Sequence, residues 1–184
     1  VVCEPLISRS PTVTADAYDD QKVVPDVIHC SPENTLTVVW PESGATASVG
    51  NELTPTRVHT KPNVWWDADD KELYTLMMTG EVIPPEREVE LREALHWLVV
   101  NIKGSDVATG HNVADYIAVG PPEGTGSHRY VFTVWRQNRA LTSEDYGVSG
   151  TKTSLEGRLK FKTMVFAAKA SGEEAPMAVA ANFF

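Results

Sequence analysis

The sequence is 184 residues long, with 42% hydrophobic and 22% charged residues, which is typical of one globular domain with a packed core. Its formal net charge of −9 argues against a nucleic-acid partner, because a protein that neutralises phosphates needs a cationic face. No apolar run approaches the roughly 20 residues that a membrane helix requires, so we expect no transmembrane segment.

The N-terminal residues 1–22 are polar and lack periodicity, which predicts an extended arm ahead of one domain over residues 23–184. The chain begins at Val1 without a Met, which suggests a processed or trimmed N-terminus. Cys3 and Cys30 are the two cysteines, and we predict a disulfide between them that tethers the arm. Such a bond indicates an oxidising compartment, and hence secretion. Two unrelated thiols in a cytoplasmic protein are the alternative.

Short apolar alternations separated by turn residues predict a mostly β fold, an antiparallel β-sandwich with few short helices. The expected strands are Thr35–Trp40, Asn63–Trp66, Glu72–Thr79, Leu95–Asn101, Arg129–Arg136 and Leu159–Phe166. Leu73–Met78 and Leu95–Val100 are apolar on both faces, so we expect them centrally, between two packed layers.

One segment, Pro84–Ala94, is predicted to be helical, because two prolines at its entry precede charged residues and a leucine pair one turn apart. An ordered loop is the alternative there. The segment Ala167–Pro176 is rich in Ala, Gly and Glu and is predicted to be a loop.

Two histidines, His96 and His128, each begin a predicted strand near the Gly/Pro-rich residues 120–126. Period-two alternation places His96 on the face shared by Leu98 and Val100. The two imidazoles are expected to converge on one pocket and to bind an anionic or polar ligand. The alternative is that each imidazole only satisfies a backbone carbonyl.

Motifs for catalysis and cofactors are missing from the sequence. It has no G-x-S-x-G nucleophile elbow, no complete phosphate loop and no twelve-residue calcium loop. We therefore predict that the protein is not an enzyme and uses neither a cofactor nor a metal.

Five segments carry a family resemblance: Val24–Ile28, Gly50–Thr56, Leu73–Leu76, His96–Asn101 and Gly120–Tyr130. In this order they resemble the phosphatidylethanolamine-binding protein family, which includes the Raf kinase inhibitor proteins. The resemblance spans about residues 22–166. It implies an antiparallel β-sandwich with a small anion-binding pocket for phosphate-like head groups.

The resemblance also assigns residues to that pocket. His96 and His128 match the family's pocket histidines, Gly120 and Pro122 match its Gly-Pro-Pro wall, and Tyr130 matches a pocket-adjacent tyrosine.

The sequence departs from the family in this pocket, where the family's W-H-H run at the strand entry is Ala94-Leu95-His96. The two carboxylates of the family's D-P-D-A-P motif become Gly80 and Val82, and a wall glycine becomes Ala118. An aspartate beside a histidine favours the charged imidazole, so its loss weakens anion binding and makes the pocket mouth more apolar. The chain also stops at Phe184, where the family often continues into a helix that covers the pocket. The sequence leaves open whether the pocket is wider or the N-terminal arm covers it.

These observations predict a non-catalytic, secreted binding or regulatory protein whose altered pocket recognises a protein or a small hydrophobic ligand. A phospholipid head-group or phosphate binder that uses His96 and His128 is the alternative. Inhibition of a protease or kinase is a second alternative, by analogy with relatives. The oligomeric state is left open.

Overall fold

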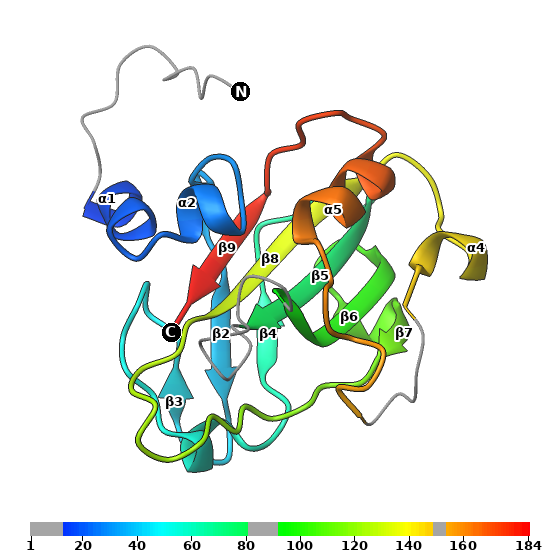
Figure 1. The fold of residues 1–184 in the computed structure, drawn as a ribbon. Helices are drawn as coiled ribbons and strands as arrows, with labels where there is room; N and C mark the ends of the chain where they lie inside the picture. Colours follow the sequence, from blue (N-terminus) through cyan, green and yellow to red (C-terminus); the bar gives the residue numbers. More distant parts are fainter. Residues whose placement is uncertain (1–12, 81–91, 149–153) are drawn as a thin grey trace.

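The computed structural model describes residues 13–80, 92–148 and 154–184 as strands, short helices and loops (Figure 1). The strands are β1 (Asn34–Thr35), β2 (Thr37–Trp40), β3 (Ala45–Thr46), β4 (Asn63–Trp65), β5 (Leu73–Gly80), β6 (Ala94–Lys103), β7 (His111–Ala114), β8 (Tyr130–Gln137) and β9 (Ala180–Phe183). The helices are α1 (Val13–Asp20), α2 (Val23–Asp26), α4 (Ser143–Tyr146) and α5 (Thr163–Ser171), with the 3-10 turns η1 (Pro55–Val58) and η3 (Val107–Thr109).

A six-stranded sheet in the order β1-β9-β8-β5-β6-β7 forms the centre of the fold. The prediction of a mostly β protein is confirmed, and β5 and β6 are buried central strands as expected. The antiparallel prediction is wrong for one pair, because β1 runs parallel to β9. The chain passes from β1 directly into β2 of the second sheet, so no hairpin imposes an antiparallel direction on this edge pair.

The two faces of the large sheet are covered differently. The three-stranded sheet β3-β2-β4 packs on one face, where Trp40 and Trp66 join Leu76 and Phe132 in one apolar core. The helices cover the other face, where residues of α1, α2 and α5 form a second core. The sandwich prediction therefore holds for one face of the sheet only.

Two segments adopt helices where the sequence predicted other structure. Residues 13–20 of the expected extended arm form α1. Tyr18 anchors this helix by packing edge-on against Phe183, with the two ring centroids 5.0 Å apart. The predicted strand Leu159–Phe166 is wrong, because α5 begins at Thr163. The predicted loop Ala167–Pro176 is wrong for residues 167–171, which belong to α5, and is confirmed for residues 172–176. A long-range contact starts this helix, since the backbone N–H of Thr163 donates to the Glu93 carboxylate at 2.9 Å.

Two further predictions fall partly outside the described residues. Of the predicted helix Pro84–Ala94, residues 84–91 lie outside them, and Ala94 is the first residue of β6. Cys30 is 9% exposed and is not a free thiol. Its expected partner, Cys3, also lies outside the described residues, so the pairing stays a prediction.

A β-bulge at the start of β6 changes the face on which His96 lies. Met78 pairs with Trp97 and Thr79 pairs with Leu95, so His96 is the extra residue between two ladder pairs. His96 contacts Tyr130, which belongs to the core between the two sheets; we call this face of the large sheet the small-sheet side. Leu98 and Val100 belong to the core under the helices, on the opposite face. The prediction that His96 shares their face is therefore wrong.

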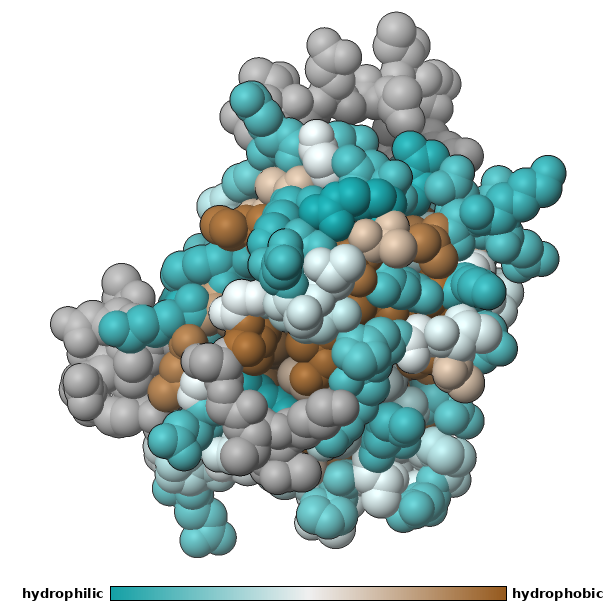
Figure 2. All heavy atoms as spheres, turned by 90° about the vertical axis from the view of Figure 1, so that its right-hand side faces the viewer, coloured by the Kyte–Doolittle hydropathy of each residue, from teal (hydrophilic) through white to brown (hydrophobic). Residues whose placement is uncertain are grey.

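The face that carries α4 and α5 has apolar side chains gathered in a shallow hollow within a hydrophilic surface (Figure 2). Val165 of α5 is exposed to 68%. In the parts of the chain that the structure describes, no helix combines the length and hydropathy needed to cross a lipid bilayer.

Candidate ligand-binding site

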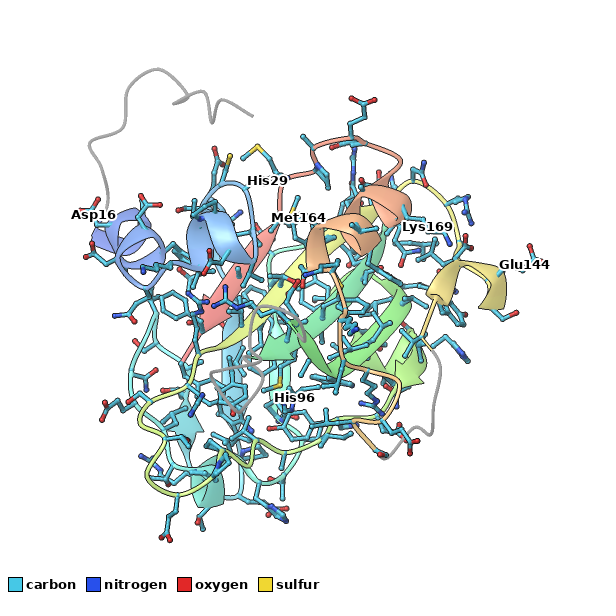
Figure 3. The ribbon with its side chains drawn as sticks, in the orientation of Figure 1. Asp16, His29, His96, Glu144, Met164 and Lys169 are labelled. Atoms are coloured by element: carbon cyan, nitrogen blue, oxygen red, sulfur yellow. The ribbon has the colours of Figure 1, made fainter. Side chains whose placement is uncertain are left out.

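His96 is held in a buried position at the bulge of β6, well away from His29 (Figure 3). It is 4% exposed, and its Nδ1 lies 2.8 Å from the carbonyl oxygen of Ile117. Because a carbonyl only accepts, Nδ1 carries the proton and Nε2 is left as an acceptor. Nε2 has no hydrogen-bond partner among the described residues.

Burial lowers the pKa of His96 from its ordinary value of 6.5. The hydrogen bond to Ile117 opposes this shift, and the nearby charge of Arg158 adds to it. Arg158 is itself buried and donates to the backbone carbonyls of His96 and Asp115. His96 is therefore a neutral imidazole near pH 7, which weakens its attraction for an anion.

The ring of Tyr130 fills the space that a side chain at position 80 would occupy. A Cβ atom added to Gly80 would lie 2.5 Å from Cδ1 and 2.6 Å from Cε1 of Tyr130, and 3.2 Å from Nε2 of His96. The Tyr130 ring meets the His96 ring edge-on, with centroids 5.3 Å apart. A carboxylate side chain at this position, which the family resemblance predicts, has no room beside the present Tyr130 ring. Val82, the other departure, lies outside the described residues.

His128 lies in the loop before β8 and is half-buried. Its Nε2 is 2.7 Å from Oγ1 of Thr125, which in turn donates to the carbonyl oxygen of Pro122 at 2.7 Å. Because the threonine hydroxyl has a single proton, His128 is the donor in the first bond. This chain of bonds fixes the turn that carries His128.

A cavity of about 660 Å³ is lined by Tyr130 but not by His96, and we call it the Phe184 cavity. Its apolar lining consists of Leu53, Pro55, Val119, Pro121, Tyr130, Phe183 and Phe184. Its polar lining includes Asn51, Glu52, Ser127, His128 and Arg129. Tyr130 thus both contacts His96 and lines the cavity.

The C-terminal strand places the two phenylalanines of the Phe184 cavity. Phe184 exchanges two backbone hydrogen bonds with Tyr130, of 3.0 and 3.1 Å, and the two rings stack with centroids 5.4 Å apart. Asn182 anchors the strand to the small-sheet side, since its amide donates to the carbonyl oxygens of Leu36 and Ala47. The aromatic floor of the cavity is therefore part of the sheet framework.

The loop over residues 50–55 supplies the opposite wall of the cavity. Gly50 has φ +94, and a Cβ there would lie 2.9 Å from the Phe183 ring, so this close approach requires glycine. The Glu52 carboxylate accepts a hydrogen bond from the Ser127 hydroxyl at 3.2 Å and so links the two walls.

The basic residue Arg129 is already held by the protein. Its guanidinium lies 3.3 Å from the Asp26 carboxylate, which Arg92 also contacts at 3.1 Å, and it donates to the carbonyl oxygen of Gln21. Arg129 therefore contributes more to holding the cavity wall than to binding a ligand anion.

The structure separates the residues that the sequence grouped into one pocket. His128 and Tyr130 line the Phe184 cavity, whereas His96 lies behind Tyr130 and outside the lining. Gly120 and Pro122 are exposed and Ala118 is half-buried, and none of the three is in the lining. Their neighbours Val119 and Pro121 line the cavity instead. A ligand role for the expected residues stays a prediction.

Several lining residues were not predicted from the sequence. The sequence assigns no site role to Phe183 and Phe184, which line the cavity because β9 pairs with β8. The segment Gly50–Thr56 carried part of the family resemblance but received no site role. Within the described residues, no group of three or more His, Cys, Asp or Glu side chains is arranged to hold a metal ion.

The family model of the phosphatidylethanolamine-binding proteins matches residues 32–182. The chain belongs to this family. A 26 kDa secreted antigen of Toxocara canis is 35% identical over 121 residues, which make up 66% of this chain and 46%, about half, of the antigen.

Three solved structures have a similar fold. The solution structure of CG7054 is 37% identical, covers 88% of this chain and 89% of its own, and superposes with a TM-score of 0.65. The carboxypeptidase Y inhibitor, solved in complex with its cognate proteinase, is 24% identical with a TM-score of 0.72 over 93% of both chains. The phosphatidylethanolamine-binding protein of Plasmodium vivax is 17% identical, with a TM-score of 0.63 over 92% of this chain and 94% of its own. The last two support the fold alone.

Proposed function

We propose that this chain is a non-catalytic binding protein of the phosphatidylethanolamine-binding protein family, and that its ligand is small, largely apolar and bound in the Phe184 cavity. The observation that carries the proposal is the position of the Tyr130 ring, which lies over Gly80 beside His96 and also lines the cavity. This ring leaves His128 in the cavity wall and His96 behind it.

The size and lining of the Phe184 cavity support an apolar ligand. Small-molecule sites have volumes of about 300–1,000 Å³ and are lined mainly by apolar and aromatic groups with a few polar ones. The cavity of about 660 Å³ lies in this range and has an aromatic floor. Each Å² of apolar ligand surface removed from water contributes about 25 cal/mol.

The head-group alternative has less support. An anion between the two histidines would meet a neutral His96 imidazole and the face of Tyr130, and it would find no aspartate at position 80 to keep His96 charged. His128 already donates its Nε2 proton to Thr125.

A neutral dye tests the proposal directly. We expect N-phenyl-1-naphthylamine to bind with a stoichiometry of one and a fluorescence increase. Leu53→Asp and Phe184→Ala are expected to weaken this binding about tenfold or more, because each removes apolar contact from the cavity. Met177→Ala is the matched control, since Met177 is exposed and does not line the cavity.

Phosphate and phosphoethanolamine titrations distinguish an apolar-ligand site from a head-group site. Weak or undetectable binding of both, measured by calorimetry, agrees with the apolar-ligand proposal. The proposal fails if the dye does not bind, or if phosphoethanolamine binds tightly and the variant His96→Gln abolishes that binding.

We also propose that Cys3 and Cys30 form a disulfide and that the protein is secreted. The buried, non-free Cys30 and the secreted antigen among the relatives support this proposal. The expected result is an intact mass, under non-reducing conditions, that is lower by two hydrogens than the mass after reduction. Alkylation of both cysteines in the native, unreduced protein is the result that contradicts the pairing.

A further inference from the structure

A second cavity, which we call the Arg57 cavity, adjoins the Phe184 cavity. It has a volume of about 460 Å³ and is lined in part by Glu42, Ser43, Pro55, Arg57, His59 and Val119. Pro55 and Val119 line both cavities, so the two meet at this shared wall. A ligand that extends from the Phe184 cavity past this wall therefore enters the Arg57 cavity, whose lining includes charged side chains.

The Arg57 cavity is rich in polar donors. Arg57 and His59 are exposed, and neither side chain has an ion pair or a hydrogen bond with any other described residue. Glu42 lines the same cavity and lies beyond ion-pair distance of both, so it leaves the guanidinium unneutralised. The cavity therefore presents a planar cation and an imidazole to whatever enters it.

The backbone that carries these side chains is fixed on several sides. The Ser43 hydroxyl donates to the Arg57 carbonyl at 2.5 Å, and the Tyr116 hydroxyl donates to the Val58 carbonyl at 2.7 Å. Tyr116 belongs to the segment that runs past η1 before it enters β8 (Figure 1). The Arg57 cavity thus has an ordered wall, built from η1, the turn after β2 and the segment around Val119.

We propose that the Arg57 cavity binds the anionic head of an amphipathic small molecule, an alkyl monocarboxylate, whose apolar chain lies in the Phe184 cavity. This inference rests on the proposed function, because it uses the same apolar cavity. A guanidinium binds a carboxylate through two parallel hydrogen bonds, which gives both charge and orientation. The two cavities supply the two kinds of surface that such a ligand has.

The test compares two ligands of equal chain length that differ in charge. Decanoate and 1-decanol are titrated against bound N-phenyl-1-naphthylamine at pH 7 and low salt. Decanoate is expected to displace the dye at about tenfold lower concentration than 1-decanol, in line with one or two charge-assisted hydrogen bonds. The double variant Arg57→Gln, His59→Gln is expected to remove this advantage and to leave 1-decanol unchanged.

Lys61→Gln is the matched control, because Lys61 is exposed near the cavity but does not line it. It should keep the preference for decanoate, so a loss there would indicate a general charge effect and overturn the inference. Equal displacement by the two ligands, or a preference that survives in the double variant, overturns the head-group site while the proposed function stands. Failure of both ligands to displace the dye overturns both.

Discussion

Replacing Gly80 with alanine is expected to push the Tyr130 ring off β5 and to lower the free energy of unfolding by about 1–3 kcal/mol, the usual cost of overpacking a core. The added Cβ would lie 2.5 Å from the Tyr130 ring, which is 5% exposed and packed between His96 and Phe184. The ring therefore cannot stay where it is. Denaturant unfolding monitored by fluorescence measures the loss.

A double-mutant cycle shows whether Tyr130 is the group that clashes. In a Tyr130→Ala background, Gly80→Ala should cost little, because the ring is already gone. Gly120→Ala is the matched control, since a Cβ there meets nothing within 4 Å. If Gly80→Ala is as costly without the ring as with it, the steric explanation is wrong.

The same substitution has a consequence for the site. When the ring leaves, His96 should become accessible from the Phe184 cavity, and its ring proton resonances should lose the shift caused by the edge-on Tyr130 ring. The Tyr130 ring thus accounts both for the glycine at position 80, where it leaves no room for a side chain, and for the burial of His96. An aspartate introduced at Gly80 alone requires Tyr130 to move as well.

The strands were predictable because their signal is local. Buried strands such as β5 and β8 have apolar residues on one or both faces, and the sequence shows this without knowledge of their partners. Helix α5 was not predictable in this way. The alternation over residues 159–166 favours a strand, and the group that starts the helix is the carboxylate of Glu93, 70 residues earlier.

The site was predictable only in part, because its geometry depends on non-local contacts. His128 and Tyr130 follow from the motif before β8 and do line the cavity. His96 moves to the small-sheet side through a bulge, and nothing in a period-two pattern marks where a bulge inserts a residue. Phe184 becomes part of the cavity because β9 pairs with β8, and the contact of Phe184 with Tyr130, 54 residues earlier, is not encoded in the local pattern.

Replacing Glu93 with alanine is expected to lower the free energy of unfolding by about 2–4 kcal/mol, because it removes the acceptor of two buried donors and leaves a cavity. Glu93 is 7% exposed, and its carboxylate accepts hydrogen bonds from the backbone N–H and the hydroxyl of Thr163. Loss of these bonds should release the first turn of α5. Thermal unfolding followed by circular dichroism, with hydrogen exchange of the α5 amides, measures both effects.

The pH dependence of stability gives a second, independent test of Glu93. Burial raises the pKa of Glu93 above its ordinary value of 4.5, although the hydrogen bonds from Thr163 oppose the shift. A carboxyl whose pKa is raised in the folded state contributes stability that is fully present below the unfolded pKa and is lost as the pH rises through the folded pKa. Wild-type stability should therefore decline above about pH 4.5, relative to Glu93→Gln, which keeps an acceptor for Thr163 and does not ionise. Thr163→Val should steepen the decline, because it removes a hydroxyl that favours the ionised form. Parallel pH curves for the wild type and Glu93→Gln would show that Glu93 is not the group responsible.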